Sequence, residues 1–513
     1  MEGEKALRER LGLFGEEYVG FDQVYSGKVF VAGDTVHVSS ELLLEPNCGA
    51  IVGYAWQAGK KLLWHSPPEF AETYSRFATI SRMDENALQR KVVALFGQAY
   101  QMHAQDIHII HTGTATRILF RVLGDMLPYA LWDAETGEQT MALLYNYFAQ
   151  ETGSSVFTPY ERLDGRIVNP RVLPGSVRAI RLHSEPIQSQ SDKPSCFMTL
   201  RLLYDATSAK GSLGERIAQL GMTSYQQGLI LGLAQSQGLI VISGATGHGK
   251  STVLKHVFEG MVKAMPEKAY VSVEDPPEFV IEGVRQIQVD SSEGASHLRQ
   301  ERYRDALAGA LRSDPDVLMI GEIRYPEACE LALSAAQTGH AVWATLHAND
   351  SFGIVQRMEG LLAARGERQA RQRLCDPLIL SGLIHQRLVP VLCEQCKEPL
   401  LTHPLDAKTM ARFAKTFPDL ASLCVRGKGC AMCHGQGVSA MTLCAEVVPV
   451  DSALCAAMLH DIQDVRTQWH KQYGTCLDVA LSKAVKGILD PRDIEKRFGL
   501  SLENIKYDSS KIF

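Results

Sequence analysis

The stretch VISGATGHGKST, residues 241–252, decides the fold of this 513-residue chain. Residues 244–251 match the pattern G-x-x-x-x-G-K-[ST], and the apolar run GLIVIS before them is typical of a buried strand. The residues after the loop predict a helix whose apolar face is formed by Val253, Leu254, Val257, Phe258 and Met261. A strand, a glycine-rich loop and a helix in this order predict a phosphate-binding loop. A chance glycine-rich turn is the alternative, and both flanking elements argue against it.

The residue types of this loop suit a nucleoside triphosphate. Glycines let backbone N–H groups curl around phosphate oxygens, and the N-terminus of the following helix adds its dipole. Lys250 supplies a positive charge to the β- and γ-phosphates, and Ser251 can ligate the Mg²⁺ that accompanies ATP. The predicted cofactor-binding residues of the loop are Gly244, Thr246, Gly247, Gly249, Lys250, Ser251 and Thr252.

The composition limits what such a nucleotide site can serve. Lysine and arginine total 52 against 58 aspartates and glutamates, which gives a net charge of −6 and no general positive field for nucleic acid. The charged N-terminus, MEGEKALRER, precedes no apolar signal segment, and Gln235, Ser236 and Gln237 interrupt the most apolar stretch. We therefore expect a cytoplasmic protein with no membrane span and no direct nucleic-acid partner.

Changes of pattern along the chain predict several domains, as its length also suggests. Up to residue 205, apolar runs and turn residues follow an α+β pattern. A stretch rich in Gly, Ser and Ala follows, and beyond it apolar runs alternate with helical segments, as in a mostly parallel sheet buried on both faces. The predicted parts are an N-terminal α+β docking domain (1–80), a second α+β domain (81–205), a linker (206–215), an ATPase domain (216–390), a cysteine-rich subdomain (391–438) and a helical C-terminal subdomain (439–513).

Three more apolar runs of the ATPase region are followed by polar residues. VSVEDPPE supplies Glu274 and Asp275, and DVLMIGEIR places Glu322 after another run. TGHAVWATLHAND supplies His340 and His347, which we expect at the end of a fourth strand. Ligands of open α/β sheets bind at the carboxyl ends of the strands, so we expect these side chains around the phosphates. Taken singly, each acid is more often a turn or cap residue, and each histidine more often structural.

The four segments, in this order and spacing, resemble the Walker A, Asp, Walker B and His boxes of the secretion ATPase superfamily. The resemblance spans residues 85–500 and implies a RecA-like P-loop motor domain that hydrolyses MgATP. It makes Glu274 the catalytic carboxylate and places Glu322 at the metal and the attacking water. The other nucleotide contacts that it implies in these boxes are Asp275, His340 and His347. The chain departs from the usual pattern, which has Pro, Ser and Asp, at Ala245, His248 and Tyr325.

The second predicted domain also resembles this family, and the resemblance makes it PAS-like. QDIHIIHTGTATRILFRVLG is similar to the family's A-S-D-I-H-I-E-P segment and its later R-x-R-x-D-G strand, with Leu119 and Leu123 where Arg and Asp are usual. In this family, arginines of the second domain reach the nucleotide of their own or a neighbouring subunit. The resemblance gives that role to Arg166, Arg181 and Arg201. Solvated arginines on a strand face are the alternative.

Four cysteines have the spacing of a zinc site. Cys393 and Cys396 form one C-x₂-C pair, and Cys430 and Cys433 form a second pair 33 residues further on. Two such pairs suit a structural, tetrahedral Cys₄ zinc, whereas a redox dithiol expects one pair near a βαβ unit. Cys424 and Cys444 lie close enough in sequence to be substitute ligands. The cysteines that we expect to be small buried hydrophobes are Cys48, Cys196, Cys329, Cys375, Cys455 and Cys476.

The tetracysteine insertion is similar to the assembly and type II secretion branch of the family, and Glu446 matches a glutamate that ends a family segment. The resemblance therefore implies a homo-hexameric ATPase at the inner-membrane face, which powers pilus or pseudopilus assembly. Its partners would be a membrane platform protein, accessory assembly proteins and, indirectly, pilin-like subunits. The alternatives are a conjugation or type IV secretion ATPase, a nucleic-acid motor such as a hexameric helicase, and a nucleotide-gated scaffold without hydrolysis. The intact Lys250, Glu274 and Glu322 disfavour the scaffold.

Overall fold

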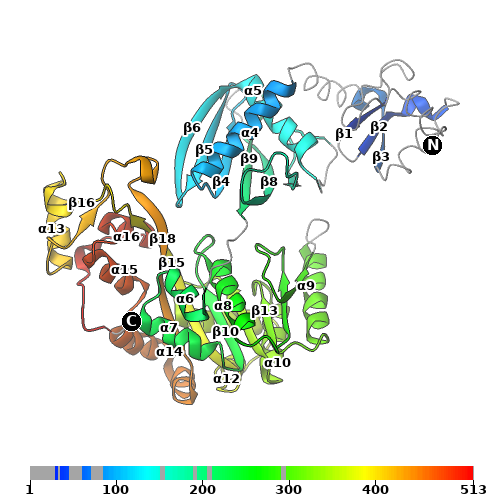
Figure 1. Cartoon of the computed structure of the whole chain (residues 1–513). Coiled ribbons are helices and arrows are strands. Elements are labelled where there is room, and N and C mark those ends of the chain that lie inside the picture. The colour runs from blue at the N-terminus through cyan, green and yellow to red at the C-terminus, as the bar shows by residue number, and fades with distance from the viewer. Residues whose placement is uncertain are drawn as a thin grey trace. The chain divides into compact units, whose positions relative to one another are not determined.

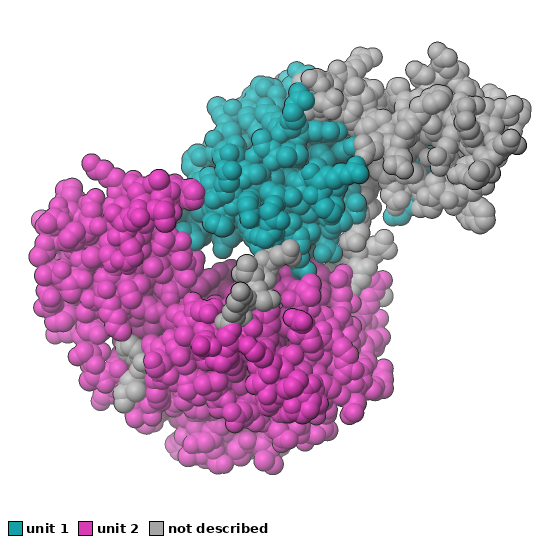
Figure 2. Space-filling view, viewed as in Figure 1, with its two compact units in different colours: residues 1–205 teal, residues 206–513 magenta. Residues whose placement is uncertain are grey.

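The computed structural model (Figure 1) describes residues 29–32, 35–44, 61–70, 85–150, 156–188, 193–204, 211–289 and 296–511. The chain divides into two compact units, residues 1–205 and 206–513 (Figure 2). No helix in these described ranges is both long and apolar enough to cross a membrane. Cys48, most of residues 1–80 and residues 206–210 of the predicted linker lie outside the described residues.

The first unit contains a small sheet and a larger one. In the small sheet β2 pairs antiparallel with β1 and parallel with β3; the strands are β1 (Val29–Ala32), β2 (Thr35–Ser39) and β3 (Lys61–His65). The larger sheet has the order β6-β5-β4-β9-β8-β7, and every neighbouring pair in it is antiparallel. Its strands are β4 (Asp106–His111), β5 (Ala115–Val122), β6 (Asp125–Asp133), β7 (Leu163–Ile167), β8 (Val177–Ile187) and β9 (Ser195–Tyr204).

One face of the six-stranded sheet is apolar and covered by two helices, α4 (Glu85–Gln101) and α5 (Ala134–Leu143). The alternation of β4 and β5 places residues such as Ile107, Ile109 and Phe120 in this core. The intervening positions of β5 include Arg117, which is exposed, and Arg121, which is half-buried.

The second unit is built on a seven-stranded sheet of order β12-β11-β13-β14-β10-β15-β18. All neighbouring pairs are parallel except β15 and β18, which are antiparallel. The strands are β10 (Gly238–Ser243), β11 (Tyr270–Glu274), β12 (Val284–Gln288), β13 (Val317–Ile320), β14 (Ala341–Leu346), β15 (Leu380–Leu392) and β18 (Val438–Pro449). The predicted α/β class with a mostly parallel sheet is confirmed.

Both faces of this sheet are covered by helices, which explains its continuous apolar runs. Leu239 and Val241 of β10 face one core and Ile240 and Ile242 face the other. The first core is shared with α9 (Ser296–Leu311), α10 (Pro326–Gln337), α11 (Ser351–Ala363), α12 (Ala370–Leu374) and α14 (Ser452–Tyr473). The second is shared with α6 (Leu213–Gln219), α7 (Ser224–Leu233) and α8 (Lys250–Ala264). Residues 213–215 of the predicted linker therefore belong to a helix.

A smaller core joins the cysteine-rich segment to the C-terminal helices. Leu400, Phe413 and Val425 pack in it with Leu481 and Ile494. The elements that contribute are η3 (Leu400–Thr402), α13 (Ala407–Thr416), β17 (Cys424–Val425), α15 (Cys476–Val485) and α16 (Pro491–Phe498), and β16 (Glu398–Pro399) pairs antiparallel with β17. The long strands β15 and β18 connect this core to the main sheet, because the two strands stay paired from the main sheet into this smaller core.

Candidate active site

The phosphate-binding loop connects the buried strand β10 to helix α8. Gly244 has φ 153°, and a Cβ atom there would lie 2.6 Å from the backbone oxygen of Gln386. Gly249, at φ 76°, precedes the first residue of α8 and supplies no side chain to cap it. The N–H groups of the first turn therefore point out of the helix where phosphate oxygens can accept from them. The predicted apolar face of α8 is buried as expected.

Lys250 faces the inside of this loop. Its ammonium donates to the carbonyl oxygens of Gly244 at 2.8 Å and Ala245 at 3.3 Å. Burial lowers the pKa of Lys250, and the negative charge of Glu322 partly opposes this effect. The lysine and the strand-end carboxylate are thus within electrostatic reach of each other. Ser251 and Thr252 follow in the first turn of α8, as predicted for a phosphate and metal site.

Glu274 is the last residue of β11, and only 9% of it is exposed. The Ser272 hydroxyl and the Gln286 amide each donate to its Oε1 atom at 2.8 Å. Two donors from neighbouring positions of β11 and β12 hold the carboxylate in one orientation. Such a fixed carboxylate at the carboxyl edge of the sheet can accept a proton from a bound water.

Glu322 lies two residues beyond the end of β13 and is the centre of a charged cluster. Its carboxylate lies 2.8 Å from an Nη2 atom of Arg324 and 3.2 Å from Nε2 of His347. Arg324 also lies 3.9 Å from Asp275, so that it connects the residues after β11 and β13. The parallel strands β11, β13, β14 and β10 thereby bring Glu274, Glu322, His347 and the phosphate loop to one edge, as their order in the sheet requires.

His340 does not lie at this edge. It precedes β14 instead of ending it, and its Nδ1 atom lies within 3.0 Å of Thr338 and Ala335 at the end of α10. Its carbonyl accepts from the N–H of Gly238, the first residue of β10. The strand between the two histidines separates them by about 20 Å at 3.3 Å per residue. The expectation that both histidines end the strand is therefore wrong for His340 and right for His347.

The three arginines predicted to reach a nucleotide lie side by side in the first unit. Arg166 of β7 pairs in register with Arg181 of β8, which pairs with Arg201 of β9. Arg201 donates to the buried carboxylate of Asp106 at 2.8 Å. Arg181 and Arg201 are exposed and Arg166 is half-buried. The structure brings these arginines together with one another, on the sheet face opposite the apolar core.

The four predicted zinc ligands converge at the base of the cysteine-rich subdomain. Their sulfur atoms all lie within 4.8 Å of one another. Sulfur separations of 3.7 Å join Cys393 to Cys430 and Cys396 to Cys433, and 3.8 Å separates Cys430 from Cys433. A tetrahedral ion with Zn–S bonds of about 2.3 Å requires sulfur separations of about 3.8 Å, so this arrangement fits zinc closely.

Backbone groups prepare this cluster for a cation. The N–H groups of Cys430 and Gly437 each lie 3.2 Å from the sulfur of Cys433. Burial alone would raise the pKa of Cys433, but these donors and the neighbouring thiols bring it down to about 6. Cys424 and Cys444 lie outside the cluster. Five of the cysteines expected to be buried lie in the described residues, and all five are buried: Cys196, Cys329, Cys375, Cys455 and Cys476.

Several residues that position this site were missed by sequence reasoning. Gln386 of β15 donates to the carbonyl of His248 at 2.6 Å and holds the phosphate loop to the neighbouring strand. Glu446 of β18 is 6% exposed and accepts from the Ser351 hydroxyl at 2.8 Å. Burial would raise the pKa of Glu446, yet contact with His470 helps to hold it below its ordinary value. Glu446 had been singled out in the sequence as a family match, whereas Gln386, Ser272, Gln286 and Arg324 were missed. Among these four only Arg324 had a signal, because it lies inside the GEIR segment.

Comparison with known proteins identifies the family. A family model described as type II/IV secretion system protein matches residues 81–496. The chain belongs to this family. Among its relatives, the type II secretion system ATPase E of Vibrio cholerae is 30% identical over 383 residues, which are 72% of this chain and 67% of the relative. The type IV pilus assembly ATPase PilB of Thermus thermophilus is 27% identical over 463 residues, 86% of this chain and 46% of the relative.

Two solved structures have a similar fold. The ATPase DotB of Legionella pneumophila aligns with a TM-score of 0.54 at 19% identity, covering 78% of this chain and 92% of the other. DotB of Yersinia pseudotuberculosis aligns with a TM-score of 0.55 at 18% identity, covering 82% and 95%. The predictions of the secretion ATPase superfamily and of an ATP-hydrolysing enzyme are confirmed by the family match and by the relatives of Vibrio cholerae and Thermus thermophilus that are named as ATPases.

Proposed function

We propose that this secretion ATPase uses MgATP hydrolysis to power assembly of a type IV pilus or a type II secretion pseudopilus. The observation that carries the proposal is the convergence of Lys250, Glu274 and Glu322 with the phosphate loop at one edge of the sheet. The relatives named for type II secretion and for pilus assembly support the choice of machine. In this proposal the second unit is a RecA-like P-loop motor domain.

The residues at the sheet edge divide the reaction among them. The loop residues Gly244, Thr246, Gly247, Gly249, Lys250, Ser251 and Thr252 bind the phosphates. Bound Mg²⁺, held by Ser251 and oriented by Glu322, would neutralise charge on the β- and γ-phosphates. Water attacks the γ-phosphorus, the bond to the β–γ bridging oxygen breaks, and Glu274 takes the proton of the water. ADP and inorganic phosphate result. Arg324, which also contacts Asp275, and His347 hold the Glu322 carboxylate in position. All of these side chains lie around the bound nucleotide.

The remaining parts of the chain would convert this reaction into movement. We assign Arg166, Arg181 and Arg201 of the second, PAS-like domain to a nucleotide of their own or a neighbouring subunit in a homo-hexamer. The cysteine cluster holds a structural zinc, because its sulfur separations fit a tetrahedral ion. Residues 1–80, or the second domain, dock on a membrane platform protein or on accessory assembly proteins at the cytoplasmic face of the inner membrane. Pilin-like subunits are moved indirectly, through that platform.

The proposal is tested in the producing cell with Glu322→Gln, which removes one charge from the cluster without changing its size. Surface fibres should disappear while pilin accumulates in the inner membrane, as counted by electron microscopy at matched pilin levels. Glu367→Gln is the matched control, because Glu367 forms a half-buried ion pair with Arg373 and takes no part in the charged cluster around Glu322. An excess of fibres would indicate a retraction motor. Unchanged fibre counts would refute the proposal and favour substrate transfer or a nucleic-acid motor.

A further inference from the structure

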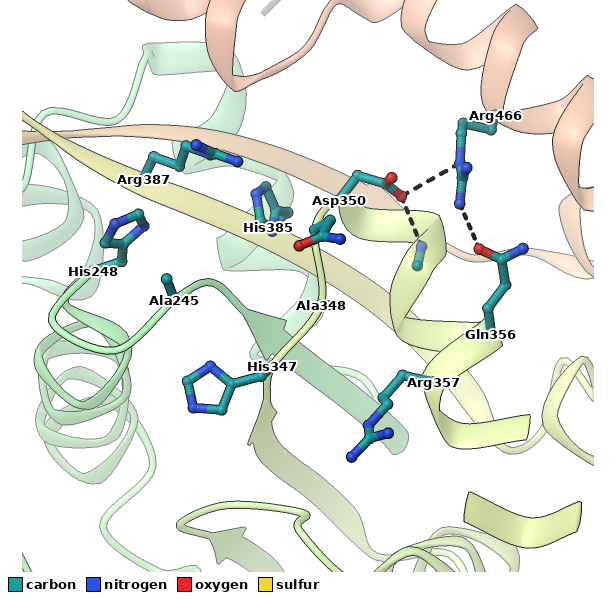
Figure 3. Close-up of a pocket in the computed structure, with 12 residues that line it drawn as sticks. Ala245, His248, His347, Ala348, Asp350, Gln356, Arg357, His385, Arg387 and Arg466 are labelled. Carbon is teal, nitrogen blue, oxygen red and sulfur yellow. Dashed lines mark hydrogen bonds and ion pairs between the residues drawn. The ribbon is translucent and has the colours of Figure 1, made fainter. Parts of the chain in front are cut away.

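A cavity of about 470 Å³ lies beside the phosphate-binding loop in the second unit (Figure 3). Figure 3 shows His248 of the loop, together with His385 and Arg387 of β15, on one side of it and Arg357 of α11 on the other. The segment from His347 to Asp350 runs between them. The cavity therefore begins at the nucleotide site and extends toward helices α11 and α14.

The lining of this cavity is polar and positively charged. The arginines Arg357, Arg387 and Arg466 face a single carboxylate, that of Asp350, which leaves an excess of two positive charges. Pockets that bind a nucleobase are lined mostly by apolar and aromatic side chains. Among the described residues that line this cavity there is no Leu, Ile, Val, Phe, Tyr or Trp. The composition suits a small doubly charged oxyanion better than the base of a nucleotide.

The arginines are not equally available. Arg466 is paired, with its Nε atom 3.4 Å from Asp350 and an Nη2 atom donating to Gln356 at 2.7 Å. Arg387 donates to the carbonyl of Arg497 at 3.2 Å and lies over the Phe498 ring, 4.9 Å from its centroid, and neither partner carries a negative charge. Arg357 has no hydrogen-bond or ion-pair partner among the described residues, although it lines the cavity. Arg357 and Arg387 thus supply the excess charge.

A buried histidine also lacks part of its hydrogen bonding. His385 is 3% exposed, and no group in the described ranges pairs with its Nε2 atom. Its Nδ1 atom lies 2.9 Å from the hydroxyl of Ser243, the last residue of β10. Burial lowers the pKa of His385 to about 4, so the ring is neutral at pH 7. The Ser243 hydroxyl also donates to the carbonyl oxygen of Ile384 at 3.3 Å, so it accepts the Nδ1–H of His385 and leaves Nε2 as an acceptor that is unpaired among the described residues, to which the hydroxyl of a phosphate anion can donate.

His347 connects the cavity to the hydrolysis site. Its ring lines the cavity, while its Nε2 atom lies 3.2 Å from the carboxylate of Glu322. An anion that leaves the γ-phosphate position can therefore pass this histidine into the cavity. We propose that the cavity binds the inorganic phosphate released by ATP hydrolysis, separately from the nucleotide, and so controls its release. This inference rests on the proposed ATPase function and adds a second anion site to it.

The test is calorimetric titration of inorganic phosphate into the whole chain saturated with Mg²⁺ and a non-hydrolysable ATP analogue. The analogue fills the phosphate loop, so any phosphate that binds must occupy another site. We expect one phosphate per chain. Arg357→Gln should weaken its binding about tenfold or more, because a charge-assisted contact is lost. Arg368→Gln, an exposed arginine outside the cavity lining, should leave it within twofold.

Steady-state kinetics give a second measurement on the same proteins. Inorganic phosphate should inhibit wild-type hydrolysis noncompetitively with respect to ATP. Arg357→Gln should weaken that inhibition by the same factor by which it weakens phosphate binding. No phosphate binding in the presence of the analogue would overturn the inference. It would also be overturned if Arg357→Gln weakened binding of the analogue but not of phosphate, since the cavity would then hold the ribose or base. Failure of the proposed function would look different, as a wild-type chain that hydrolyses no ATP.

Discussion

The cysteine cluster and the phosphate edge are built in different ways. The cluster takes its four sulfurs from two short turns, each with two cysteines three positions apart. The phosphate edge takes Glu274, Glu322 and His347 from the ends of three strands and Lys250 from the loop and helix that follow a fourth, and the order of these strands in the sheet differs from their order in the chain. Local spacing therefore specifies the first site almost completely, whereas the second exists only when the sheet has formed.

The largest effect that can test this contrast is loss of the metal. Cys393→Ser should reduce bound zinc from about one ion per chain to near none, because the tetrahedral Cys₄ site loses a ligand and structural zinc binding is worth about 10–16 kcal/mol in small peptide sites. Metal analysis of protein purified without chelator measures this. Cys424→Ser is the control, since Cys424 lies outside the cluster. Equal zinc contents in the two variants would show that the cluster holds no zinc.

A smaller but still large effect is expected at the phosphate edge. Lys250→Ala should lower kcat for ATP by about 10²–10³-fold, because a positive charge on the developing oxyanion is lost. The thermal unfolding temperature should change little, since Lys250 contacts loop carbonyls and contributes little to packing. ATPase assays and calorimetry check the two halves of this prediction. Near wild-type turnover in the folded variant would remove Lys250 from the reaction.

The smallest effect separates the two histidines. His347→Ala should lower ATPase activity by about tenfold, as expected for loss of one positioning contact to a carboxylate. His340→Ala should leave turnover within about twofold in dilute protein, because His340 lies at the opposite, N-terminal end of β14. Loss of its hydrogen bonds to Thr338 and Ala335 should affect mainly stability. The ratio of the two kcat values is the readout. Equal losses would mean that His340 acts on the nucleotide by a route outside its own subunit.

The sequence by itself determined the parts of this protein that depend on short-range chemistry. The pattern of residues 244–251 predicts a phosphate loop because glycine torsions, a lysine and a helix start must follow one another directly. The two C-x₂-C pairs predict a metal cluster for the same reason. The acids after β11 and β13 were found because their apolar runs end abruptly, and parallel strands must bring those ends together.

Only the tertiary structure decided which side chains meet across the sheet. Gln286 reaches Glu274 because β12 lies in register beside β11, and Gln386 holds the phosphate loop because β15 is the neighbour of β10. His340 lies outside the site because it precedes β14, which begins at Ala341. No local sequence pattern distinguishes the start of this strand from its end. The cavity beside His347 depends on contact between α11 and α14, where Gln356 and Arg466, 110 residues apart in sequence, are hydrogen-bonded. Such contacts follow from the packing of the folded chain, because long-range neighbours leave no spacing in the sequence.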